Sequence, residues 1–164
     1  MRRLQTLSLV MASALAACSP EPEPAKPSLS FRTDGATYVW SIPDSQTPAL
    51  VLGAAGGSGA APALALSCSD AATGGLRVGA LIAEPVPVPL ELKAGPAVFI
   101  VTPRRVVTDA AVSLEGEGAL PQGWFEALAA AEQLRLQYGD QGLALRGPGE
   151  ALAREWADLC RQRP

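Results

Sequence analysis

The residues that could do chemistry in this chain are few, and histidine is absent from its 164 residues. Catalytic Ser-His-Asp triads, Cys-His pairs and histidine-based zinc sites are therefore excluded. Two carboxylates stand close together in Glu115-Gly116-Glu117, and a glycosidase needs such a pair. We expect these glutamates to lie in a solvated, glycine-flanked turn, because no aromatic residue that could hold a sugar stands nearby.

Three other segments match functional motifs only in part. Gly56-Gly57-Ser58-Gly59 is followed by Ala60 and lacks the pattern of a nucleophile elbow or a P-loop, so a flexible loop is expected. Arg104-Arg105 could bind an anion, but neighbours on a strand point to opposite faces, which favours solvated side chains. Asp140 stands in a predicted turn. The sequence thus predicts no catalytic residue, no metal site, no cofactor and no enzyme.

The N-terminal segment carries the clearest motif. Arg2 and Arg3 precede an apolar run that ends in Leu15-Ala16-Ala17-Cys18, and the run of about 14 residues is shorter than the roughly 20 that span a bilayer. This arrangement resembles the signal peptide and lipobox of bacterial lipoproteins. The resemblance implies that residues 1–17 are removed and that Cys18 becomes an acylated first residue, with a diacylglycerol on its sulfur and a further acyl chain, such as palmitate, on its amine.

Two alternatives for the leader stay open. An ordinary secretory signal peptide could be cut after Ala14-Leu15-Ala16 with Cys18 incidental, and the arginine pair also invites a twin-arginine reading. Under the lipobox reading, Ser19 rather than aspartate follows Cys18. By analogy with the enterobacterial sorting rule, this favours a periplasm-facing anchor in the outer membrane.

Residues 18–28 follow as a proline-rich stalk. Four prolines at near-alternating positions favour extended polyproline II structure, at roughly 3 Å per residue. We expect the stalk to hold residues 29–164, a single domain of ordinary size, off the bilayer. A proline-rich ligand for a partner domain is the alternative.

Charge and cysteine content restrict the function further. The net charge of −3 becomes −5 without the leader's two arginines, which argues against nucleic acid and against anionic membrane surfaces as partners. With Cys18 acylated, Cys68 and Cys160 remain and predict one disulfide in an oxidising periplasm. Both belong to apolar faces, one on an alternating strand and one on a helical stripe. A redox or metal pair is the alternative, but it would lack a Cys-x-x-Cys spacing and histidine.

Alternating apolar residues predict a mainly β fold, an antiparallel sandwich or open barrel with two short helices near the C-terminus. Residues 86–92 are expected to form an edge strand, because prolines 85, 87 and 89 deny it a ladder on one side. Residues 97–101 are a continuous apolar run and a candidate central strand. Further expected elements are strands at 29–33, 38–42, 49–53, 64–68, 76–82, 106–107 and 112–114, a helix at 124–131, a hairpin at 134–145, and a helix with Pro148 at its first position.

One further resemblance concerns the whole predicted domain. The segment Leu134-Arg135-Leu136-Gln137-Tyr138-Gly139-Asp140 and the ending Leu159-Cys160-Arg161 resemble those of small exported alphaproteobacterial proteins of unknown function. That resemblance implies export, the disulfide and a β-rich fold. We expect a non-enzymatic envelope lipoprotein that binds a protein partner or supports the envelope. The alternative is a lysozyme-inhibitor-like protein that binds an exogenous hydrolase, although the Ser-Gly-x-x-Tyr stretch of that group is missing.

Overall fold

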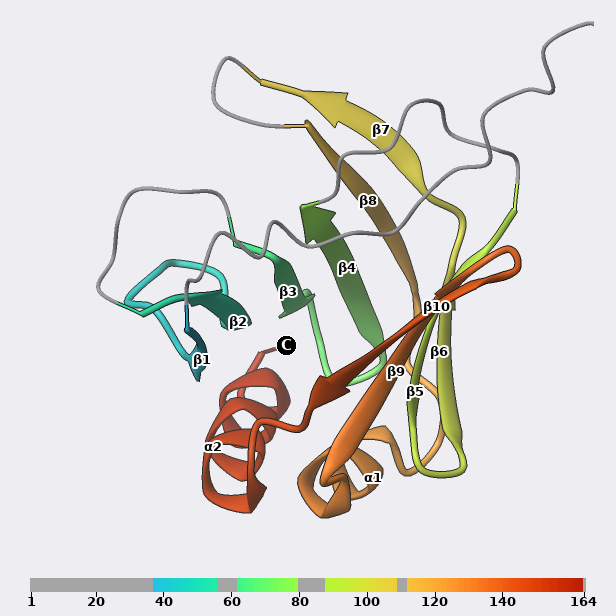
Figure 1. The fold of residues 1–164 in the computed structure, drawn as a ribbon. Helices are drawn as coiled ribbons and strands as arrows, with labels where there is room; N and C mark the ends of the chain where they lie inside the picture. Colours follow the sequence, from blue (N-terminus) through green and yellow to red (C-terminus); the bar gives the residue numbers. More distant parts are fainter. Residues whose placement is uncertain (1–36, 56–61, 80–87, 109–111, 164) are drawn as a thin grey trace, which may run out of the picture.

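A computed structural model describes residues 37–55, 62–79, 88–108 and 112–163 (Figure 1). These residues form mainly antiparallel β structure with two helices, so the predicted fold class is confirmed. The elements are β1 (Tyr38–Ser41), β2 (Ala49–Ala54), β3 (Leu64–Cys68), β4 (Thr73–Gly79), β5 (Leu90–Ala94), β6 (Ala97–Val101), β7 (Arg104–Val107), β8 (Val112–Ala119), α1 (Trp124–Ala130), β9 (Gln133–Tyr138), β10 (Gln141–Arg146) and α2 (Glu150–Arg161). The leader, the stalk, the expected strand at 29–33 and the glycine-rich loop at 56–59 lie outside the described residues.

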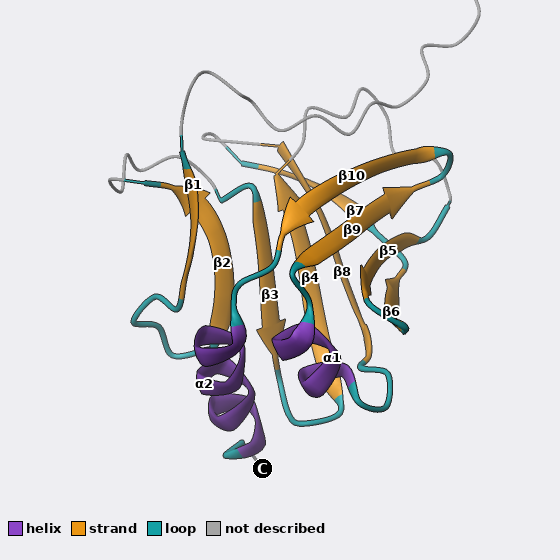
Figure 2. Cartoon of the chain, turned by 60° about the horizontal axis from the view of Figure 1, so that its bottom comes forward, coloured by secondary structure: helices purple, strands orange, loops and turns teal. Residues whose placement is uncertain are grey.

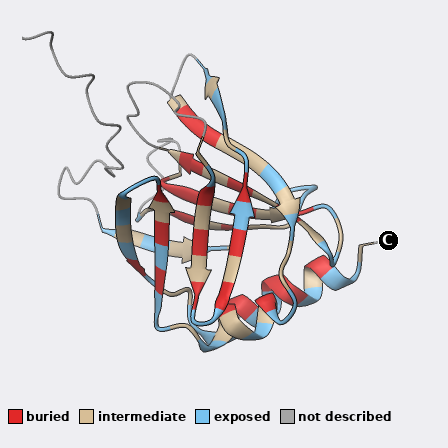
Figure 3. Ribbon diagram, turned by 90° about the vertical axis from the view of Figure 1, so that its right-hand side faces the viewer, coloured by how far each residue is buried: buried red, intermediate tan, exposed pale blue. Residues whose placement is uncertain are grey.

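The strands form two sheets that pack face to face (Figure 2). The six-stranded sheet has the order β1-β2-β3-β4-β8-β7, and the four-stranded sheet has the order β10-β9-β5-β6. Strict alternation along the strands sends one side chain in two into the space between the sheets. Leu64, Leu66 and Cys68 of β3 are buried there, as are Leu90 and Leu92 of β5. The buried and exposed stripes that result cross the strands in Figure 3.

Two glycines let the chain pass from one sheet to the other. A Cβ atom on Gly116 would lie 2.8 Å from the carbonyl oxygen of Thr102, and one on Gly118 would lie 2.7 Å from that of Ile100. A side chain at either position would push β6 away from β8. Because Gly116 and Gly118 have no side chains, β6 can run close over β8 before the chain enters β7.

The opposite ends of the two sheets are joined by a tryptophan. The indole Nε1 of Trp40 in β1 donates a hydrogen bond of 2.8 Å to the carbonyl oxygen of Arg146 in β10. The two sheets thus contact each other near both ends, through β6 against β8 and through β1 against β10.

The predicted places of β5 and β6 in the sheet were wrong. β5 lies inside the four-stranded sheet, paired with both β6 and β9, whereas β6 is at its end. The prolines do not prevent this because β5 begins at Leu90, directly after Pro89, so that every N–H of the strand is free to pair. The apolar run of β6 is covered by α1 and β8 instead of a second ladder partner.

The last helix is fixed to the six-stranded sheet. The Sγ atoms of Cys68 and Cys160 lie 2.02 Å apart, at the bonding distance that the sequence led us to expect, and both residues are buried. α2 begins at Glu150, after Gly149 with φ 87°, so Pro148 precedes the helix and does not occupy its first position as predicted. No helix of the described residues is long and apolar enough to cross a membrane.

Candidate binding site on the outer face of the six-stranded sheet

Strand register brings four residues into one row across the outer face of the six-stranded sheet. Ala65 of β3 pairs with Arg77 of β4, Arg77 with Glu115 of β8, and Glu115 with Arg104 of β7. Side chains of such partners share a face, with their Cβ atoms about 5 Å apart. Arg77 and Arg104 therefore stand on either side of Glu115, on the same face of the sheet.

This row borders a hollow of about 490 Å³. Small residues leave the space open, and a Cβ atom on Gly75 would lie 2.5 Å from the Oγ of Ser67. The hollow is lined by Ala65, Ser67, Gly75, Leu76, Arg77, Thr102, Arg104, Glu115, Gly116 and Glu117. It is a polar depression with hydroxyl groups and charges of both signs at its surface.

One carboxylate of the hollow has two partners on a single oxygen atom. The Oε1 atom of Glu115 lies 3.0 Å from the Nε of Arg77 and accepts a hydrogen bond of 3.1 Å from the Oγ of Ser113. Ser113 is 2 % exposed, so Glu115 satisfies the hydroxyl of a buried residue. These contacts hold the centre of the hollow in one arrangement.

Two further charges of the hollow have no such partner. Arg104 and Glu117 are exposed, and among the described residues neither forms an ion pair within 4.0 Å. Arg104 stands on the end strand of the sheet, where nothing of the described chain pairs with it on the far side. The guanidinium can bind a carboxylate or phosphate in a bidentate manner, and Glu117 can accept hydrogen bonds or pair with a cation.

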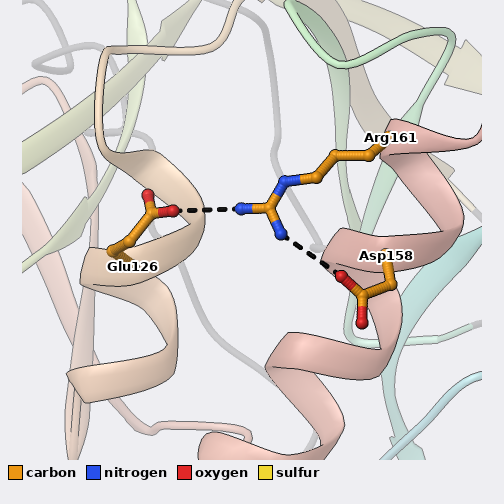
Figure 4. Close-up of polar contacts among 3 residues, drawn as sticks. All are labelled: Glu126, Asp158 and Arg161. Carbon is orange, nitrogen blue, oxygen red and sulfur yellow. Dashed lines mark hydrogen bonds and ion pairs between the residues drawn. The ribbon is translucent and has the colours of Figure 1, made fainter.

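A second hollow, of about 340 Å³, lies between α1 and α2, but its arginines are engaged. Arg161 reaches Glu126 of α1 with one Nη atom at 3.0 Å and Asp158 with the other at 3.2 Å (Figure 4). Its guanidinium also lies 5.2 Å from the ring centroid of Phe125, and Arg154 pairs with Glu150 one turn earlier in α2. Arg161 therefore joins the two helices and Arg154 is paired within α2, which makes the outer hollow of the six-stranded sheet the stronger candidate site.

The predicted turn at Glu115-Gly116-Glu117 was wrong, because these residues lie within β8. The glycines that suggested a turn instead accommodate the backbone of β6, while β4 and β7 pair with β8 on either side. Both carboxylates face the hollow, but one oxygen of Glu115 is already shared by Arg77 and Ser113. This arrangement suits binding better than the acid and base roles of a glycosidase.

The other candidates lie where expected or outside the described chain. Arg104 and Arg105 pair with Glu115 and Leu114 respectively and so belong to opposite faces of the sheet. Asp140 lies in the turn between β9 and β10, after Gly139 with φ 60°, and is not among the residues that line the hollow. Cys18 and the expected lipobox fall outside the described residues.

Sequence reasoning missed Arg77, Ser113, Ser67 and Thr102 as members of this site. The sequence did contain a signal for Arg77. It stands between the apolar residues Leu76 and Val78, and this alternation places its side chain on the outer face of β4. Nothing local identified its neighbours on other strands. Within the described ranges, no three His, Cys, Asp or Glu residues come together as a metal site would require.

Comparison with protein-family models finds no match to this chain, and comparisons with curated proteins and with solved structures find none either.

Proposed function

We propose that this chain is a lipid-anchored protein of the bacterial cell envelope that binds a partner, without catalysis, through the outer hollow of the six-stranded sheet. The observation behind the proposal is which charged side chains of the hollow are paired and which are not. Arg77 and Glu115 neutralise each other and fix the centre, whereas Arg104 and Glu117 remain exposed and unpaired beside them. A partner that offers an anion to Arg104 and a cation or N–H group to Glu117 would complement both.

Two features support the location in the envelope. The leader resembles that of bacterial lipoproteins, with Cys18 as the acyl acceptor. The Cys68–Cys160 pair stands at disulfide distance in the core, and structural disulfides persist in oxidising compartments such as the periplasm. The anchor would keep the protein attached to the membrane.

A photo-cross-linking amino acid at Thr102, which lines the hollow, tests the binding role in intact cells. We expect a specific adduct there and none with the same cross-linker at Ala71, an exposed residue of the β3–β4 turn. The double variant Arg104→Gln/Glu117→Gln should abolish the adduct without unfolding the protein, because both side chains are exposed.

The identity of the captured molecule then separates the functions. An envelope protein supports the binding module, and a hydrolase captured in this way would assign the inhibitor-like role. Equal adduct yields at Thr102 and Ala71 would contradict the proposal that the hollow is the binding site. An adduct at Thr102 whose yield is unchanged in the double variant would contradict it as well.

A further inference from the structure

The outer face of the four-stranded sheet gathers three cations from different strands. Lys93 of β5 pairs directly with Arg135 of β9. Arg146 of β10 stands opposite Gln133, diagonally next to Arg135 on the same face. We call Lys93, Arg135 and Arg146 the cationic face.

Two like charges directly opposite each other on a sheet are unfavourable, and the structure shows how one of them is relieved. The Nζ of Lys93 lies 3.0 Å from a carboxylate oxygen of Glu91 and donates a 3.2 Å hydrogen bond to the Oε1 of Gln137. Arg135 and Arg146 are exposed, and no ion pair forms on either within the described part of the chain. The face thus keeps two arginines available for anions outside the molecule.

Few carboxylates counter these charges. Glu91 is the one acidic residue on the described strands of this face, while Glu132 and Asp140 lie beyond the two ends of β9. Acidic residues gather elsewhere, above all on the helices, where the exposed ones are Glu126, Glu150, Glu155 and Asp158, although Arg154 and Arg161 pair with three of them. A molecule with this separation of charge turns its positive side towards an anionic surface, even though its net charge is negative.

The same face also has an apolar margin. Ile100 of β6 is 52 % exposed and lies directly across from Glu91, and Val98 lies across from Lys93. Figure 3 shows the exposed stripes of the molecule from the side of this sheet. Cations spread over a sheet face, with an apolar side chain beside them, match a bilayer surface of phosphates and acyl chains more closely than they match a narrow peptide.

We infer that the cationic face is a contact surface for an anionic phospholipid bilayer. Each basic residue held near such a surface strengthens binding about fivefold. Attraction of this size is weak for a free protein but sufficient to orient one that is already held at the membrane. The inference goes beyond the proposed function, and its electrostatic part holds whether or not Cys18 is acylated. With the four-stranded sheet against the bilayer, the hollow on the other sheet would face away from it.

Co-sedimentation of the full chain with two kinds of vesicle tests the inference. One kind is pure phosphatidylcholine, and the other contains phosphatidylcholine and phosphatidylglycerol in equal amounts. The ratio of the two partition coefficients isolates the electrostatic contribution of the whole chain, since an acyl chain contributes to both, and Arg2 and Arg3 of the leader are the same in every variant. We expect the ratio to fall about 25-fold in Arg135→Gln/Arg146→Gln at low salt, and to fall with added salt in the unsubstituted chain.

The control is Arg105→Gln/Arg154→Gln. It also removes two positive charges, but from exposed positions away from the cationic face. It should keep most of the preference for the anionic vesicles. Equal losses in the two double variants would reduce the effect to net charge, and no preference in the unsubstituted chain would refute the contact surface. Unchanged thermal unfolding of both variants verifies that the fold is intact.

Discussion

Trp40 and Arg146 are 106 residues apart in the chain, yet the indole N–H of one donates to the main-chain carbonyl of the other at 2.8 Å. The bond joins the first strand of the six-stranded sheet to the last strand of the four-stranded sheet. It therefore ties together margins that no β ladder connects within the described chain.

Substitution Trp40→Phe removes this bond while keeping an aromatic ring. We expect a loss of about 1 kcal/mol in the free energy of unfolding, the usual contribution of one hydrogen bond. Amide exchange should accelerate in β1 and β10 more than in β4, as measured by mass spectrometry. Uniform acceleration would show instead that the substitution weakens the whole core.

The pair Cys68 and Cys160 connects positions 92 residues apart, so its disulfide restricts a long loop of the unfolded chain. Replacing both by alanine should lower the free energy of unfolding by about 2–5 kcal/mol, measured by urea denaturation. A reductant should destabilise the natural chain but not the double variant. Non-reducing peptide mapping of the exported protein must yield the linked peptide pair, and free thiols or an intermolecular dimer as the main species would disprove it.

Asp70 gives the β3–β4 turn a defined dependence on pH. Its Oδ1 accepts hydrogen bonds of 2.7 Å from the backbone N–H groups of Ala72 and Thr73, and these bonds hold the pKa of Asp70 below its ordinary value of 3.8. A lowered pKa in the folded state stabilises the protein above pH 3.8 and ceases to do so as the pH falls through the folded value.

We therefore expect Asp70→Ala to be less stable than the natural chain at neutral pH. The difference should shrink as the pH falls below 3.8, as followed by urea midpoints at each pH. Asp44→Ala serves as the control, because Asp44 is exposed in the β1–β2 connection. A gap between Asp70→Ala and the natural chain that stays constant down to acid pH would contradict this origin of the stability.

The proposed lipoprotein anchor predicts that Cys18 is the sole acyl acceptor. The Cys18→Ala protein should be unacylated and released from the membrane fraction. Metabolic labelling with a fatty-acid analogue measures the first outcome and cell fractionation the second. Label retained by the variant would disprove the lipoprotein assignment.

The binding role predicts that no single carboxylate or hydroxyl is essential for a turnover reaction. The purified protein should show no activity on peptidoglycan, glycan, ester or peptide substrates that survives repurification. Activity that disappears on changing one side chain would overturn this view. Glu115, Glu117 and Asp140 would then be the first residues to examine.

The sequence by itself determined the local elements. Alternation of leucines identified β3 and β9, Gly139-Asp140 marked the tight turn of the last hairpin, and the stripe through Trp156 and Cys160 identified α2. Each of these signals is local, either a short-range period in side-chain polarity or a pair of turn residues, and one segment carries it alone. The cysteine pairing was accessible for a different reason, since elimination left only two candidates.

The tertiary structure alone decided which strands are neighbours. β5 proved to be interior and β6 to be terminal. Glu115 and Glu117 proved to lie on a strand, where Gly116 and Gly118 leave room for the carbonyl oxygens of Thr102 and Ile100. The same holds for both charged surfaces, the row of Arg77, Glu115 and Arg104 and the cationic face of Lys93, Arg135 and Arg146. Their members come from different strands and meet only through register, and register depends on long-range pairing that no local pattern in a single sequence records.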